Sequence, residues 1–154
     1  MTIKIKSLLF FLFIINSSLT AQQFEWAKSF GNTGPDYARS IAIDNSGNVY
    51  TAGLTYYGSY KRVIIYKMDS SGNNNWSLYL GSSLNTDVSS IAVDGSGNLY
   101  VTGIFSGTMS YLNSSFNIGS MTASGFDVFI LKFNPARRVV WAKSYGAINE
   151  QQSV

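Results

Sequence analysis

The chain has 154 residues, 45% of them hydrophobic and only 12% charged, which excludes an intrinsically disordered chain and a coiled coil. It contains no cysteine and no histidine, which excludes disulfides, cysteine nucleophiles, histidine general bases and nearly every type of zinc site. The formal net charge is +3, from 11 basic and 8 acidic side chains.

The first 21 residues have the pattern of a secretory signal peptide. Lys4 and Lys6 precede an apolar run at 8–15, and a stretch of small and polar residues ends at Ala21. A membrane-spanning helix needs about 20 apolar residues. We therefore expect a cleaved signal peptide over 1–21, no transmembrane anchor, and a secreted or cell-surface location.

Cleavage removes two lysines and lowers the net charge to +1. Because no basic stripe remains, nucleic acid is not an expected partner.

Residues 22–154 contain an internal repeat. The stretch 41–53 returns at 91–103 with eight of thirteen residues identical. A second block, Trp-x-x-x-x-Gly, begins at Trp26, Trp76 and Trp141. The repeat therefore has periods 26–76 and 76–141, and a third, truncated period starts at 141.

Each period contains four strand patterns in the same order. The first period predicts strands at 40–44, 48–52, 63–68 and 76–80, and the second at 90–94, 98–102, 128–133 and 139–145. Four antiparallel strands per period, with no helical periodicity, are typical of a β-propeller blade. The predicted fold is all-β, with about two blades plus the first strand of a third.

Turn residues separate these strands. Asp44, Asp69 and Asp94 each begin a turn in which glycine supplies the positive φ. The fourth turn, 134–137, has Arg137 where the repeat predicts glycine, and we expect Pro135 to select a different turn there. The second period is longer because of residues 106–125, which are predicted to form a projecting connection suited to binding.

These motifs resemble those of a known family. The order Trp-x-x-x-x-Gly, Ile-Ala-Val-Asp-x-x-Gly-Asn-x-Tyr-Val-Thr-Gly and Asp-x-Phe-Ile-x-Lys is similar to the secreted bacterial β-propeller repeat, SBBP, and more weakly to NHL repeats. The second period fits best, whereas the first has Arg62 where the second has Asp127. The resemblance implies a seven-bladed type of propeller in an exported bacterial protein, and no particular activity.

Two blades cannot form a ring, because closed propellers have about four to eight blades. We therefore expect either a fragment of a larger protein, with further blades in the same polypeptide, or self-association that closes the ring. The fragment is the favoured interpretation, because a chain that stops within a repeat leaves a strand edge and a blade face uncovered.

The residues that recur with the blade period are interpreted as structural. They are Trp26, Trp76, Trp141, Asp44, Gly47, Tyr50, Gly53, Asp94, Gly97, Tyr100 and Gly103. The carboxylates are also interpreted as structural, so we predict no catalytic residue and no cofactor. Binding of Ca²⁺ at the Asp turns stays an open alternative.

Four tyrosines fall in predicted connections and are candidates for ligand contact: Tyr56, Tyr57, Tyr60 and Tyr111. Together these observations predict an exported, non-catalytic propeller module that binds a protein or glycan through its loops. The alternative is part of an exported propeller lyase or hydrolase whose catalytic residues lie in other blades.

Overall fold

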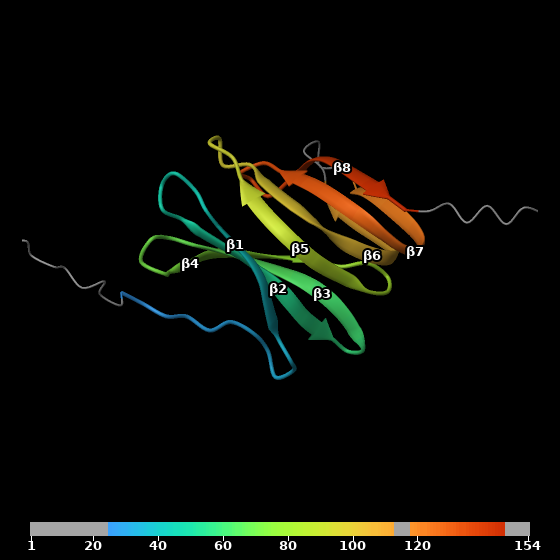
Figure 1. Ribbon diagram of the computed structural model, residues 1–154, viewed down its shortest axis with the longest axis horizontal. Coiled ribbons are helices and arrows are strands. Elements are labelled where there is room, and N and C mark those ends of the chain that lie inside the picture. The colour runs from blue at the N-terminus through green and yellow to red at the C-terminus, as the bar shows by residue number, and fades with distance from the viewer. Residues whose placement is uncertain (1–24, 113–117, 147–154) are drawn as a thin grey trace, which may run out of the picture.

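The computed structural model describes residues 25–112 and 118–146, so the predicted signal peptide lies outside the described residues. The described residues form two four-stranded antiparallel sheets in which each strand pairs with the next along the chain (Figure 1). Blade 1 contains β1 (Tyr37–Ile43), β2 (Val49–Tyr57), β3 (Tyr60–Met68) and β4 (Asn74–Leu80). Blade 2 contains β5 (Thr86–Val93), β6 (Leu99–Leu112), β7 (Ile118–Phe133) and β8 (Val139–Tyr145). The prediction of an all-β fold with four-stranded blades is confirmed.

The two blades follow one pattern of pairing. Val63 pairs with Leu80 in blade 1, and Val128 pairs with Tyr145 in blade 2. Repeat-equivalent residues therefore lie 50 positions apart in the first two strands of a blade and 65 apart in the last two. The block at Trp141 lies in β8, so it completes blade 2 as its fourth strand.

Gly53 and Gly103 each lie opposite a β-bulge. The register shifts between Ala38 and Ser40 in β1, and at the equivalent place in β5. The bulged strand comes so close that a side chain at Gly53 would overlap the carbonyl oxygen of Tyr37. Gly103 faces Asp87 in the same way. Only glycine fits where the backbone of a bulged strand approaches this closely.

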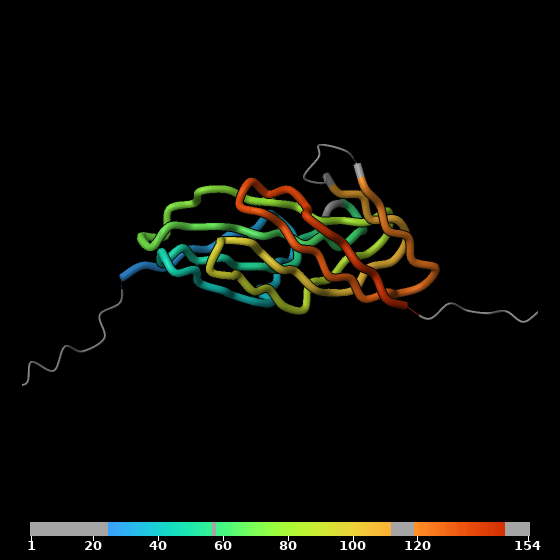
Figure 2. Tube along the Cα trace, turned by 90° about the horizontal axis from the view of Figure 1, so that it is seen from above, coloured from blue at the N-terminus to red at the C-terminus, as the bar shows by residue number. Residues whose placement is uncertain are grey.

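One hydrophobic core lies between the two blades. Tyr50, Ala52 and Leu54 of β2 are buried in the same cluster as the β6 and β7 side chains Leu99, Val101, Phe105, Phe129 and Leu131. The first strands of the two blades are in direct contact, since the backbone N–H of Ile91 donates to Ser40 Oγ at 3.1 Å. The blades therefore pack face to face, and Figure 2 shows their chain traces from above.

The prediction of a projecting connection at 106–125 was wrong. β6 continues to Leu112 and β7 begins at Ile118, so most of this stretch is a β-hairpin, which we call the arm. The arm bends at Gly107, whose φ is 74°. It then folds back against the blade 1–blade 2 linker, where the backbone N–H of Ser83 donates to the carbonyl of Thr108 at 2.9 Å. The Ser- and Thr-rich composition concealed three side chains that the arm adds to the core: Met109, Met121 and Ala123.

The turn at 134–137 also differs from the prediction. Arg137 keeps the left-handed conformation, with a φ of 63°, and its N–H donates to the carbonyl of Asn134 at 2.9 Å. Gly72 makes the same bond to Asp69 in blade 1. Pro135 therefore does not change the turn type. The left-handed conformation costs a non-glycine residue about 1–2 kcal/mol.

Residues 25–36 form no strand and lie across the face of blade 1 that points away from blade 2. Phe30 stacks on Tyr66, with ring centroids 4.3 Å apart. Among the described residues, no helix is long and apolar enough to cross a membrane.

Candidate functional site

The repeated Asp turns form a structural cluster in each blade. Asp44 Oδ1 accepts hydrogen bonds from the N–H groups of Ser46 and Asn48, at 2.9 and 3.0 Å. Its Oδ2 accepts from the Tyr50 hydroxyl at 3.2 Å. Asp94 repeats this arrangement with Ser96, Asn98 and Tyr100.

A lysine completes each cluster. Lys67 Nζ lies 3.7 Å from Asp44 Oδ2 and 5.0 Å from the centre of the Tyr50 ring. Lys132 holds the same position in blade 2, 3.9 Å from Asp94 and 5.1 Å from the Tyr100 ring. The Asp, Tyr and Lys of each blade therefore join three strands at one end of the sheet.

Hydrogen bonds hold these carboxylates in the charged form. The Asn98 side chain and backbone, followed by Ser96 and Tyr100, lower the pKa of Asp94 to about 2. Burial raises the pKa of Asp44, but the donors on Asn48, Ser46 and Tyr50 outweigh it and leave a lowered pKa. Because both oxygens of each carboxylate already accept bonds from the protein, this geometry favours turn stabilisation over Ca²⁺ binding. The described part of the chain contains no group of three or more His, Cys, Asp or Glu side chains that could hold a metal ion.

The recurring tryptophans pack against neighbouring tyrosines or turns. Trp76 lies edge-on to Tyr50 at 6.0 Å between ring centroids, and Trp141 lies likewise at 6.2 Å from Tyr100. Trp26 donates from Nε1 to the carbonyl oxygen of Ser70 at 3.0 Å. These contacts are those of packing residues.

The candidate ligand-binding tyrosines lie in strands rather than in connections, because β2, β3 and β6 are longer than predicted. Tyr56 lies in β2, next to its last residue, and lines a hollow with Arg62 and Tyr79. Tyr60 starts β3 and is exposed. The side chain of Tyr57 lies outside the described residues. The structure does not bring the four tyrosines together, since Tyr111 lies on the arm and lines a different hollow.

The hollow that contains Tyr111 is an open groove of about 330 Å³ at the outer edge of the two blades. It lies between the arm, β4 and the turn before β8. Its rim carries Tyr79, Tyr111, Arg137 and Arg138, and its other lining residues are Leu78, Leu80, Ser110, Phe133 and Ala136. We call this the arm groove.

The arm groove is basic. Its lining includes two arginines and no acidic side chain. Arg137 is exposed, and its guanidinium carbon lies 5.9 Å from the centre of the Trp76 ring. Arginine presents a planar set of donors that matches a carboxylate, and tyrosine rings supply flat apolar faces. The groove can therefore accept a ligand that combines carboxylates with apolar faces.

Sequence reasoning did not identify Tyr79 or Arg138 as site residues. The signal that could have found Tyr79 is its departure from the repeat, since both other copies of the Trp block have serine there, Ser29 and Ser144. A residue that breaks a structural repeat is free of the repeat's packing role. Arg138 offered no such signal, because its place beside Tyr111 depends on how the arm folds back.

Comparisons with known proteins agree with the architecture. The model of the SBBP β-propeller repeat matches residues 25–61 and 75–103. Each match begins at a Trp block and includes the first strands of a blade. A comparison with curated proteins finds no match. The matched segments and the two stacked four-stranded sheets together show that the chain contains SBBP β-propeller repeats.

Proposed function

We propose that this protein is an exported, non-catalytic propeller module that binds an acidic partner in the arm groove. Export is supported by the signal-peptide pattern at 1–21. A non-catalytic role is supported by the lack of histidine and cysteine and by the use of Asp44 and Asp94 to stabilise turns. The groove supplies the binding surface.

The observation that carries the proposal is that Tyr79, Tyr111, Arg137 and Arg138 line one groove. Among acidic partners, a uronic-acid glycan fits best. Its sugar rings present C–H faces to tyrosine, and its carboxylates match the arginine donors. An open groove also suits a chain-like ligand that passes through it.

The test is calorimetric titration of the protein, without residues 1–21, with an acidic oligosaccharide such as oligogalacturonate. A neutral oligosaccharide of the same length serves as the control ligand. We expect binding of the acidic ligand that weakens with added salt, because exposed charges are screened. Equal binding of both ligands, or binding of neither, would overturn the proposal.

Two matched pairs of variants locate the site. Tyr79→Ala is expected to weaken binding about tenfold, a loss of about 1.4 kcal/mol. Tyr145→Ala is its control, because Tyr145 is as exposed as Tyr79, 60% against 58%, and lies outside the groove. Arg137→Asn removes a charge at the groove and keeps a residue that tolerates left-handed backbone. Lys143→Gln removes an exposed charge from β8 and should leave binding unchanged.

A further inference from the structure

The outer face of blade 2 repeats a face that is buried in blade 1. Leu54 is 1% exposed between the blades, whereas its repeat-equivalent Ile104 is 38% exposed. Val63 is fully buried, and Val128 at the same place in blade 2 is 44% exposed. Blade 2 therefore presents to solvent the side of a blade that blade 1 uses to bind its neighbour.

The outer face of blade 1 is the complementary half. Val49 and Gly53 there are the repeat-equivalents of Leu99 and Gly103, which blade 2 turns toward blade 1. Ile41 is 64% exposed on this side, whereas its equivalent Ile91 is buried. The outer face of blade 2 thus resembles the blade 1 side of the interface between the blades. The outer face of blade 1 resembles the blade 2 side of that interface.

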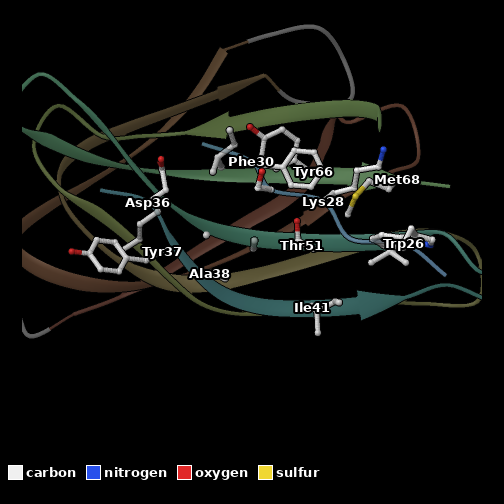
Figure 3. A pocket seen from close by; sticks show the side chains of 16 residues that line it. Trp26, Lys28, Phe30, Asp36, Tyr37, Ala38, Ile41, Thr51, Tyr66 and Met68 are labelled. Atoms are coloured by element: carbon white, nitrogen blue, oxygen red, sulfur yellow. The ribbon is translucent and has the colours of Figure 1, made fainter. Parts of the chain in front are cut away.

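Residues 25–36, which we call the cap, cover part of the blade 1 face. Trp26 and Phe30 bind Ser70 and Tyr66, as described above, and Asn32 Nδ2 donates to Thr55 Oγ1 at 2.7 Å. Figure 3 shows Trp26, Phe30 and Tyr66 among the side chains around a hollow of about 410 Å³ that remains between the cap and β1–β3. The cover is therefore incomplete.

The cap occupies the place of a strand from another blade. Trp26 packs on Gly72 in the turn of blade 1 that precedes β4. Trp76 of blade 1 is related in the same way to Arg137, the equivalent turn residue of blade 2. Trp26 therefore has the position on blade 1 that Trp76, in the fourth strand of blade 1, has on blade 2. A fourth strand of a preceding blade would place its tryptophan in the same way.

The cap also has the sequence of such a strand. Residues 26–31 match 141–146, the end of β8 and the glycine that follows it, at five of six positions. Each final glycine lies against an Asp carboxylate, from β7 at Gly146 and from the cap itself at Gly31. A side chain at Gly146 would overlap the carboxylate of Asp127, and one at Gly31 would overlap that of Asp36.

We propose that the cap is an intramolecular mimic of β8 that blocks head-to-tail association of this protein with a second copy of itself. When the cap lifts, the outer face of blade 2 in one copy docks on blade 1 of the next, and β8 takes the place of residues 26–31. Such an interface is heterologous, so it propagates until a ring closes or a filament forms. Because the described residues contribute two blades per copy, two to four copies would supply the blades of a closed propeller, which has about four to eight. This proposal does not depend on the arm groove or its ligand.

The experiment uses variants that open one face or block the other. The open variant carries Trp26→Ala and Phe30→Ala in the cap. The blocked variant carries Ile104→Lys and Val128→Lys on the outer face of blade 2, where both side chains are exposed and lysine leaves the core intact. The readout is sedimentation velocity over a range of protein concentrations.

We expect the unmodified protein to be monomeric and the open variant to associate with a dissociation constant at least tenfold lower. Adding the blocking substitutions to the open variant should abolish association. Mixed with unmodified protein, this double variant should form a one-to-one complex and nothing larger, because each partner then offers only one free face.

A monomeric open variant, or an open variant whose association survives the blocking substitutions, would overturn the proposal. Asn32→Ala is a second, milder way to open the cap, since it removes the bonds to Thr55 and Tyr56 without removing an apolar side chain. It should shift association in the same direction and leave the thermal melt of the blades unchanged.

Discussion

Trp26 donates a hydrogen bond from its indole Nε1 to the carbonyl oxygen of Ser70, 44 residues further along the chain, at 3.0 Å. The first copy of the repeated Trp block is thereby placed on the turn of a blade to which it does not contribute a strand. The other two copies, at Trp76 and Trp141, are fourth strands of their own sheets. Among the described residues, one short sequence therefore has two structural roles: it forms a fourth strand at Trp76 and Trp141, and it packs on the turn of a blade at Trp26.

Gly103→Ala should destabilise the protein by about 2–3 kcal/mol, because the new methyl group would overlap the carbonyl of Asp87 and press on the Phe129 ring. The measurement is urea unfolding. Gly125→Ala is the control, since nothing lies within 4 Å of a Cβ at that position. Equal stability of the two variants would contradict the bulge geometry.

Leu54→Ala and Ile104→Ala compare one repeat position in its buried and exposed forms. Removal of Leu54 should cost about 3 kcal/mol, because it leaves a cavity between the blades. Removal of Ile104 should cost less than about 1 kcal/mol, since that side chain already contacts water. Comparable losses in chemical denaturation would mean that the blades do not stack as described.

Arg137→Gly should be more stable than Arg137→Ala by about 1 kcal/mol, because only glycine adopts a φ near 63° without strain. Both variants lose the contact with Trp76, so their difference isolates the backbone term. In an ordinary loop the order is reversed, because glycine adds entropy to the unfolded chain. Thermal melts of the two variants distinguish these outcomes.

Asp94 should make the protein acid-sensitive. Its pKa is lowered from 3.8 to about 2 in the folded state, so its stabilising effect is fully present above pH 3.8 and is lost as the pH falls toward 2. Asp94→Asn should therefore be less stable than the unmodified protein at neutral pH and approach it in acid. Urea unfolding at several pH values checks this, and a difference that is independent of pH would contradict it.

The strands and turns were largely predictable because the repeat presents each signal twice. Asp44 and Asp94 begin turns whose glycines at 47 and 97 have positive φ, and the strands follow as expected. The expected departure from this regularity at Arg137 was wrong, because the N–H groups of Arg137 and Arg138 donate to Asn134 and hold the repeat's turn although the glycine is missing. Local hydrogen bonds, and not Pro135, decide that conformation.

The arm groove was not predictable for a different reason. Tyr111 was identified as a contact residue, but its partners Tyr79 and Arg138 are brought to it by the fold of the arm over blade 1. That fold depends on Met109 and Met121 entering the core, in a stretch whose composition resembles a loop. The arm has no counterpart in blade 1, so its packing against the core gives no repeated pattern in the sequence.

The most direct test of the proposed function is an NMR titration of isotope-labelled protein, without residues 1–21, with an acidic oligosaccharide. Chemical-shift changes concentrated on the backbone amides of Tyr79, Tyr111 and Arg138 are the predicted result, with those of Tyr60 and Tyr145 unchanged. Changes confined to other surfaces, or no change at saturating ligand, would contradict the assignment of the arm groove as the binding site.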